Sequence, residues 1–367
     1  MSLLYLIVVL SLIIAGFLNS ENSYYKVTNE LSHEVEDWIA PKFPALDKID
    51  YNRRLEILAN NQDPEIIASS SASSSIKIQT VYASSSLVST TATSTNFWPV
   101  KTVYPLPGAI LPFKRIVAYY GNFYSTEMGV LGKYPEDVML SKLNAEVEKW
   151  NITDPNTPSL PALHYIAVTA QERLGKDKKY RIRMPDEEID KVIKMAEKIN
   201  GIVFLDIQAG LSSPQIEVPL LLKYLKMPQV HLAIDPEFYM KNGGKPGSII
   251  GTIDADDINY CIDYLANLVK ENDLPPKILI IHRFTEEMIT NYKKINIVPE
   301  VQVVINMDGW GTPARKINTY KTVIYPEPVQ FTGFKLFYKN DTLASSSLMT
   351  PNDLLKLTPQ PIYIQYQ

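Results

Sequence analysis

The chain has 367 residues, of which 46% are hydrophobic and 21% are charged, a composition typical of a folded globular protein. Its net charge of −4 argues against general nucleic-acid binding, which requires a basic surface. The single cysteine, Cys261, excludes a disulfide within the chain, and its helical spacing to Ile258, Ile262 and Leu265 predicts a core position.

Residues 3–18 form an apolar run that is interrupted only by Ser11. The run is slightly short for a membrane-spanning helix and suits the hydrophobic region of a secretory signal. No Lys or Arg precedes it and no clear cleavage site follows it, so a cleaved signal peptide and an uncleaved membrane anchor are both open. In either case residues 1–20 predict an exported protein, located outside the cell or at the cell surface.

Three segments of different composition follow. Residues 21–66 are partly helical in pattern, with helices expected at 31–39 and 51–60. Residues 67–96 are dominated by Ser, Thr and Ala and cannot bury enough surface to fold, so we expect a linker. Residues 97–367 are expected to form one domain that folds without the preceding segments.

Short apolar runs alternate with helical patterns from about Lys114 onward. Such runs are typical of parallel strands that are covered on both faces. The predicted strands are 115–120, 163–169, 202–207, 230–234, 277–282, 301–306, 331–337 and 362–366.

Helix starts between these strands are marked by proline, which is favoured in the first helical turn. The residues concerned are Pro135, Pro185, Pro214, Pro313 and Pro351. Possible caps precede three of them, namely Ser213, Thr312 and Thr350. Thr285, followed by two glutamates, predicts a further helix after the fifth strand.

Eight strands with intervening helices in about 250 residues predict an α/β fold, the (β/α)8 TIM-type barrel. The last strand ends close to Gln367, so the final helix is expected to be missing. A doubly wound open sheet is the alternative, but the Gly-rich first turn typical of that fold does not occur.

Two carboxylates stand together at the end of the predicted fourth strand. Successive strand residues point to opposite faces, so Asp235 and Glu237 are expected to project to the same side. Pro236 marks the end of pairing because proline cannot donate to a strand ladder. Barrel enzymes place their chemistry at these strand ends, which makes the pair a candidate site.

Polar residues recur at the ends of neighbouring strands and on faces that point inward. Crowded carboxylates in a cleft split their pKa values, as general acid and base roles require. The candidate catalytic residues are Glu237, Asp235, Asp308, Asp206 and His282. Tyr119, Tyr120 and Trp310 could stack on sugar rings, and Gln171, Gln208, Asn306 and Lys335 complete the candidate substrate-binding residues.

The sequence lacks the motifs that are typical of several other enzyme classes. The chain has four histidines, and His164 and His231 lie inside apolar strands, where core positions are expected. No G-x-S-x-G, P-loop or G-x-G-x-x-G motif occurs. We therefore expect neither a metal site nor a cofactor.

The Asp235-x-Glu237 pair resembles the D-x-E motif of chitinase-type and some muramidase-type barrels. This resemblance implies that Glu237 is the acid and that Asp235 assists a substrate acetamido group, although the longer D-x-x-D-x-D-x-E run is absent. Over residues 115–367 the chain also resembles a group of secreted bacterial proteins without known activity. The shared elements are Tyr120-Gly121, Gly129-Val-Leu-Gly132, Asp206-Ile-Gln208, Asp235-Pro-Glu237, His282 and Asp308-Gly309.

The sequence thus favours an exported glycoside hydrolase that acts on a polysaccharide or glycoconjugate. Glu237 would be the general acid, with Asp235 orienting it or tuning its pKa. Asp308 or Asp206 would be the nucleophile or base, and His282 would hold substrate or a carboxylate. The alternative is a surface-anchored carbohydrate-binding or cell-envelope protein without catalysis on the same scaffold. Both hypotheses imply a carbohydrate ligand, and residues 3–18 could anchor either protein in a membrane.

Overall fold

A computed structural model describes residues 43–60, 103–343 and 347–367. The signal or anchor predicted at 1–20, the helix predicted at 31–39 and the linker predicted at 67–96 lie outside the described residues and stay predictions. The described residues from Leu46 onward form one compact unit. In the part of the chain that is described, no helix combines the length and the hydrophobicity needed to cross a membrane.

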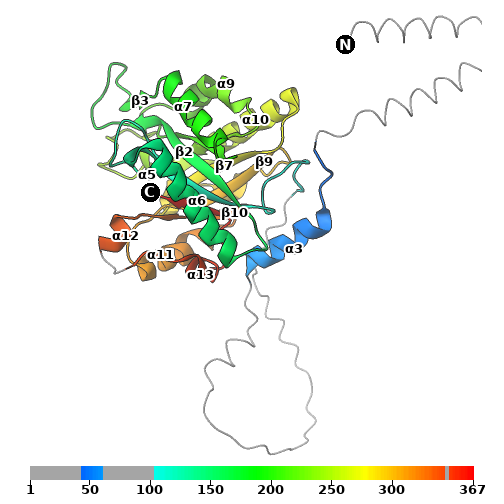
Figure 1. The fold of residues 1–367 in the computed structure, drawn as a ribbon. Helices are drawn as coiled ribbons and strands as arrows, with labels where there is room; N and C mark the ends of the chain where they lie inside the picture. Colours follow the sequence, from blue (N-terminus) through cyan, green and yellow to red (C-terminus); the bar gives the residue numbers. More distant parts are fainter. Residues whose placement is uncertain (1–42, 61–102, 344–346) are drawn as a thin grey trace, which may run out of the picture. The chain divides into compact units, whose positions relative to one another are not determined.

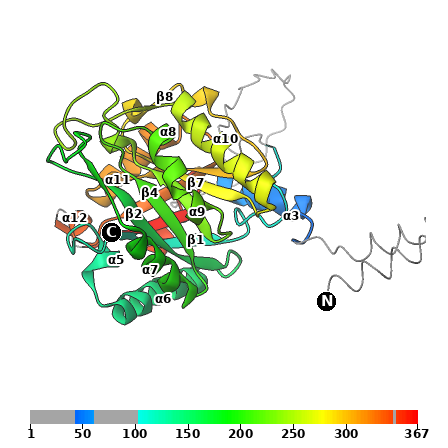
Figure 2. The same ribbon diagram turned by 90° about the horizontal axis from the view of Figure 1, so that it is seen from above.

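Eight parallel strands close into a barrel, which confirms the predicted (β/α)8 fold. Each strand is hydrogen-bonded to the next around the ring, and the last strand pairs with the first (Figures 1 and 2). This closure excludes the open sheet. The strands are β1 (Arg115–Gly121), β2 (Ser159–Ala170), β4 (Ile202–Ile207), β5 (Val230–Ile234), β7 (Lys277–Arg283), β9 (Val301–Met307), β10 (Phe331–Leu336) and β11 (Tyr363–Tyr366).

Alternation along each strand separates an outer hydrophobic layer from the barrel interior. On β5, Val230, Leu232 and Ile234 pack with the helices that surround the barrel, because they share one face of the strand. The other face points inward and carries His231 and Ala233, followed by Asp235. Apolar side chains of this inner face fill most of the lower barrel, together with the buried polar residues His231 and Gln302. Most other polar groups of the inner face lie in the upper layers.

Helices surround the strands, and Figure 2 shows α6, α7 and α10 outside the ring. Cys261 is fully buried on α10, as predicted. The helices are α5 (Val130–Lys133), α6 (Glu136–Thr153), α7 (Asp186–Glu197), α8 (Pro214–Glu217), α9 (Leu222–Leu225), α10 (Ala255–Asn272), α11 (Pro313–Thr319), α12 (Asn340–Leu343) and α13 (Pro351–Leu354).

Two connections differ from the predicted pattern. The helix expected after Thr285 is only a 3-10 turn, Glu286–Met288, because Met288 and Ile289 turn into the protein and end it. After β2 the chain forms a hairpin, in which the short strand β3 (Arg181–Arg183) pairs antiparallel with β2. Of the five predicted prolines, Pro214, Pro313 and Pro351 begin helices, and Pro135 and Pro185 stand one residue before α6 and α7.

Helix α3 (Lys48–Ala59) belongs to the same compact unit as the barrel (Figure 1). Leu58 joins the apolar cluster at the amino-terminal ends of the strands, and Tyr51 is 1% exposed. The segment before β11 holds the helix end, since the Gln360 amide donates to the carbonyl of Leu58 at 2.7 Å. Asn60 Nδ2 also donates to the Leu357 carbonyl at 2.8 Å. The bottom of the barrel is therefore built partly from residues that precede the predicted linker.

We expect that a protein truncated to residues 97–367 is less stable than one truncated to 46–367. Burying one large apolar side chain stabilises a fold by roughly 1.5–3 kcal/mol, so loss of α3 is expected to lower the free energy of unfolding by at least about 3 kcal/mol. Urea-induced unfolding of the two proteins measures this difference. Tyr51→Ala should reproduce part of it and Ile49→Ala, at a residue that is 84% exposed, should not. Equal midpoints for both truncated proteins would instead support independent folding of 97–367.

Candidate functional site

The carboxyl ends of the barrel strands surround a cavity of about 670 Å³. Its aromatic lining consists of Tyr120, Phe238, Phe284, Trp310 and Phe337. Its polar lining consists of Glu127, Gln208, Asp235, Glu237, Thr285, Asp308, Arg315, Thr319, Lys335 and Gln367. A cavity of this size with aromatic walls and converging polar groups is typical of a small-molecule or oligosaccharide site.

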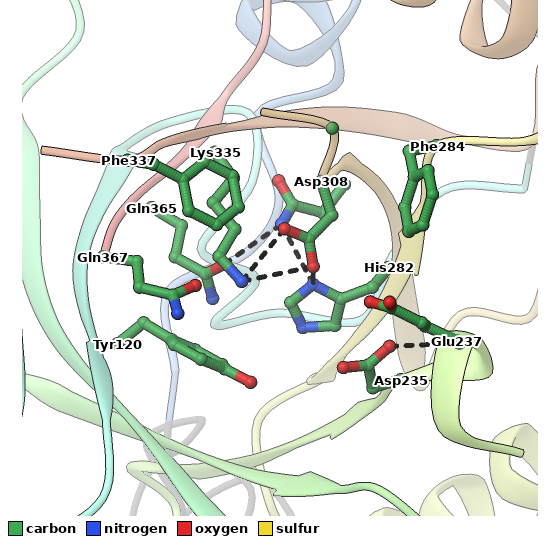
Figure 3. Close-up of polar contacts among 12 residues, drawn as sticks. Tyr120, Asp235, Glu237, His282, Phe284, Asp308, Lys335, Phe337, Gln365 and Gln367 are labelled. Atoms are coloured by element: carbon green, nitrogen blue, oxygen red, sulfur yellow. Dashed lines mark hydrogen bonds and ion pairs between the residues drawn. The ribbon is translucent and has the colours of Figure 1, made fainter. Parts of the chain in front are cut away.

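Asp235 and Glu237 both line the cavity, but not by strand alternation. The Asp235 amide makes the last bond of the strand, to the Ile207 carbonyl at 3.0 Å. Pro236 then starts a 3-10 helix, Pro236–Phe238, and Asp235 Oδ1 accepts a hydrogen bond from the Glu237 amide at 3.2 Å. Figure 3 shows that this turn directs both carboxyl groups toward the His282 ring.

Both members of this pair favour the protonated form. Burial raises the pKa of Glu237 to about 7, and the nearby charge of Asp308 adds to the effect. Burial also raises the pKa of Asp235 well above its ordinary value. Of the two, Asp235 is the more deeply buried, at 3% exposure. Near neutral pH the pair therefore carries at least one proton that it can donate.

Asp308 has the opposite character, because two cations face its carboxylate. Lys335 Nζ lies 2.9 Å from Oδ1 and 3.2 Å from Oδ2, and His282 Nδ1 lies 2.8 Å from Oδ2 (Figure 3). Burial alone would raise the pKa of Asp308, but these two partners outweigh it and lower the pKa. The cavity thus holds an ionised carboxylate beside a pair of carboxyl groups that carry at least one proton near neutral pH.

Lys335 has a further contact that fixes its position. Its ammonium lies 3.9 Å from the centroid of the Tyr120 ring, which is close enough for a cation–π interaction. Gln208 joins the same wall, since its Nε2 donates to the Tyr120 hydroxyl at 3.2 Å and to Asp235 Oδ2 at 3.3 Å. The predicted binding residues Tyr120, Gln208 and Lys335 therefore form one connected surface of the cavity.

Trp310 also lies where the sequence predicts. It lines the cavity, is 53% exposed, and has the Arg315 guanidinium 5.6 Å from its ring. An exposed indole at the rim of a cavity is a ready platform for a sugar ring.

Two predicted catalytic residues do not line the cavity. Asp206 and His282 are fully buried in the barrel interior, one layer below it. Asp206 Oδ2 lies 3.3 Å from His164 Nε2 and 3.5 Å from His282 Nε2. A carboxylate enclosed in this way cannot reach a substrate, so of the two carboxylates proposed as nucleophile or base only Asp308 faces the cavity.

Three predicted binding residues also lie elsewhere. Tyr119 points away from the interior because Tyr120 points into it, and its hydroxyl lies 3.3 Å from that of Tyr338 in a separate pocket. Asn306 is buried below Asp308, and its Nδ2 lies 3.4 Å from the Gln365 side-chain oxygen. Gln171 lines a groove beside the β2–β3 hairpin, which carries it away from the cavity.

Several lining residues were missed by the sequence analysis. Phe284, Phe337 and Gln367 follow inward-facing residues by two positions, so continued alternation from His282, Lys335 and Gln365 would have found them. Glu127 comes from the loop after β1 and Arg315 from the first turn of α11, and no periodicity in the sequence marks either of them.

Three side chains among the described residues are arranged as ligands of one metal ion could be, which the sequence did not indicate. The ligand atoms of His164, Asp206 and His282 all lie within 4.8 Å of one another. His164 was predicted to be a core residue, and it is indeed fully buried. The pattern of β2 could not indicate that the His164 ring faces the Asp206 carboxylate of β4 and the His282 imidazole of β7.

Comparison with known proteins adds little. Neither the protein-family models nor the curated proteins compared with the chain give a match. Among solved structures, the Bacillus subtilis mannanase man26 is similar with a TM-score of 0.37 at 11% identity, over 69% of this chain and 79% of that one. The YdhT protein from Bacillus subtilis gives a TM-score of 0.37 at 11% identity, over 73% and 89% of the two chains.

A ruminal GH26 endo-beta-1,4-mannanase gives a TM-score of 0.32 at 12% identity, over 69% of this chain and 59% of that one. Likeness at this level carries no argument about activity. The barrel assignment rests on the hydrogen-bonded strand order, and the chemistry rests on the residues at the cavity.

Proposed function

We propose that the protein is an exported glycoside hydrolase that cleaves a polysaccharide or glycoconjugate in the cavity at the barrel mouth. The observation that carries the proposal is that the carboxyl groups of this cavity differ in protonation. Glu237 and Asp235 favour the protonated form, and Asp308 in the same cavity is ionised. A proton donor and a carboxylate that flank one bond are what glycoside hydrolysis requires.

In the proposed reaction Glu237 donates its proton to the glycosidic oxygen as the bond to the anomeric carbon breaks. Asp308 then either attacks that carbon or removes a proton from the attacking water. Asp235 holds the Glu237 turn through the amide hydrogen bond, and Tyr120 and Trp310 provide faces for sugar rings. If Asp308 attacks, a water then displaces it from the anomeric carbon and gives its proton to Glu237, which restores both groups. If water attacks, Asp308 releases the proton it took to solvent and Glu237 regains a proton from solvent.

One observation favours the alternative of a carbohydrate-binding protein without catalysis. Lys335 and His282 already occupy both oxygens of Asp308, and such pairing weakens a carboxylate as nucleophile or base. In that case the aromatic and polar lining of the cavity would bind glycan, and no bond would be cleaved.

The test is to incubate the purified full-length protein with a panel of neutral, amino-sugar and acidic polysaccharides and to follow release of reducing ends. Release from at least one class, lost in Asp308→Asn, supports the hydrolase. The anomeric configuration of the first product, read by NMR, then distinguishes attack by Asp308 from attack by water. Binding by calorimetry without any release would support the binding protein, and absence of both would overturn the proposal.

The pH dependence follows from the raised pKa of Glu237. A general acid acts in its protonated form, so activity is expected to fall as pH rises through about 7. The sequence analysis suggested that Asp235 tunes this pKa by its charge. In the structure burial is the main cause that raises both pKa values. The charges of Asp206 and Glu237 raise the pKa of Asp235 further, whereas the charge that adds to the raised pKa of Glu237 is that of Asp308 and not that of Asp235.

Asp235→Asn is therefore expected to lower activity through the loss of its contacts and to leave the alkaline limb in place. The pH profile of kcat/KM for wild type and variant measures this. A downward shift of the limb in Asp235→Asn by one pH unit or more would show that Asp235 is ionised in the working enzyme.

A further inference from the structure

A second polar cluster lies in the barrel interior, below the cavity and apart from its carboxyl pair. It consists of His164 on β2, Asp206 on β4 and His282 on β7, and all three side chains are fully buried. We infer that these residues bind a divalent first-row transition-metal ion. This inference is independent of the proposed glycoside hydrolysis, because it concerns only what the barrel interior holds.

The distances within the cluster fit ligands of one ion better than they fit hydrogen bonds. His164 Nε2 and His282 Nε2 lie 3.3 and 3.5 Å from the same oxygen of Asp206. Charge-assisted N–H···O bonds are about 2.7–2.9 Å long. Two atoms that ligate one ion tetrahedrally at about 2.0–2.1 Å are separated by roughly 3.3–3.4 Å.

Beyond the two long contacts with one another, the inner atoms of the cluster have no hydrogen-bond partner among the described residues. This holds for Nε2 of both histidines and for both oxygens of Asp206. Buried polar atoms are rarely left without a hydrogen bond, and a buried carboxylate without one is especially costly. An ion among these atoms would satisfy the carboxylate and both imidazoles at once.

The outer nitrogen of each imidazole is held in the way that metal-binding histidines require. His282 Nδ1 lies 2.8 Å from Oδ2 of Asp308, and His164 Nδ1 lies 2.6 Å from the Tyr363 hydroxyl. The Tyr363 hydroxyl in turn accepts a hydrogen bond from Gln365 Nε2 at 3.0 Å. A histidine that donates Nδ1–H to an outer partner presents the Nε2 lone pair to the metal. Both rings direct Nε2 toward Asp206, where each would offer a lone pair to a bound ion.

The donor set selects the class of ion. Two imidazoles and one carboxylate suit zinc, iron, cobalt or manganese, whereas calcium and magnesium prefer oxygen ligands. Since the three ligands come from different strands, a bound ion would link β2, β4 and β7 across the barrel interior and stabilise the closed sheet. Metal binding would displace the proton that otherwise lets His282 pair with Asp206.

The test is the metal content of the full-length protein. The protein is incubated with Zn²⁺, separated from free ion by gel filtration, and analysed by mass spectrometry for zinc. We expect one zinc ion for each wild-type chain and at least a tenfold lower content in Asp206→Asn and His164→Ala. His231→Gln is the matched control, because His231 is also buried in the barrel but accepts from the Ile278 amide outside the cluster. It should retain the ion.

A second measurement needs no variant. Zinc should raise the melting temperature of the wild-type protein and a chelator should lower it, and Co²⁺ should give the visible absorption of a tetrahedral site. Lack of retention of zinc, cobalt, iron and manganese by the wild type would overturn the inference. Equal zinc retention by Asp206→Asn and wild type would also overturn it, since the ion would then be held elsewhere.

Discussion

Glu237→Gln is expected to reduce glycan hydrolysis by roughly 10² or more, while glycan binding survives. The amide keeps the shape and hydrogen-bonding capacity of the side chain but cannot deliver a proton to the leaving oxygen. The loss should appear in kcat, measured as release of reducing ends, with the dissociation constant for an oligosaccharide unchanged within a few-fold. Burial of Glu237 and its raised pKa are the reasons to assign it this role.

Glu127→Gln is the matched control for this experiment. Glu127 lines the same cavity but is exposed, and it pairs with Lys339 at 3.3 Å. Its substitution should leave kcat nearly unchanged. If Glu237→Gln retains full activity, the proton comes from another group, and Asp235 is then the candidate because it is also protonated.

The barrel could be predicted from the sequence because each strand carries its own signal. Short apolar runs that are covered on both faces mark the strands, and the polar residue at the end of each inward face marks the mouth. Asp235, Asp308 and Lys335 could be found in this way. The alternation rule requires only that a strand continues. It allows only one of Tyr119 and Tyr120 to face the cavity, but without the register it cannot show that this residue is Tyr120.

The contacts across the barrel could not be predicted. His164 and His282 meet Asp206 because the tilt of the strands brings residues of β2, β4 and β7 into the same layer of the barrel. The shift in register between neighbouring strands that produces this layer cannot be derived from the sequence of any single strand. Gly333 shows how closely the side chains of this interior are packed. A Cβ at Gly333 would lie 2.7 Å from Asn306 Oδ1 and 2.8 Å from the Tyr363 ring. These spatial relations depend on all eight strands at once.

The 3-10 turn after β5 and the position of α3 could also not be predicted from the sequence. Pro236 indicates the end of β5, but it does not show that a 3-10 turn then directs Glu237 into the cavity. Helix α3 was expected as a helix, yet its place under the barrel depends on tertiary contacts with the segment before β11. Its low intrinsic amphipathicity gave no indication of that docking.

Lys335→Met is expected to lower the free energy of unfolding by about 3–5 kcal/mol, because it leaves a buried carboxylate without its main partner. Lys335 is 3% exposed, contacts both oxygens of Asp308, and also lies over the Tyr120 ring. Urea-induced unfolding at neutral pH measures the loss. In the double variant Lys335→Met/Asp308→Asn the unpaired charge is gone, so much of the stability should return.

Lys339→Met is the control, because its ion pair with Glu127 joins two side chains that are 73% and 77% exposed. Such surface pairs contribute about 0–1 kcal/mol, so this variant should unfold almost as the wild type does. A small effect at both lysines would mean that His282 alone compensates Asp308. A large effect at Lys335 that the second substitution does not relieve would mean that the lysine stabilises the barrel through its packing on Tyr120. Relief in the double variant would show that Lys335 is the group that keeps Asp308 ionised, and therefore that this lysine sets the charge of the carboxylate proposed to act in catalysis.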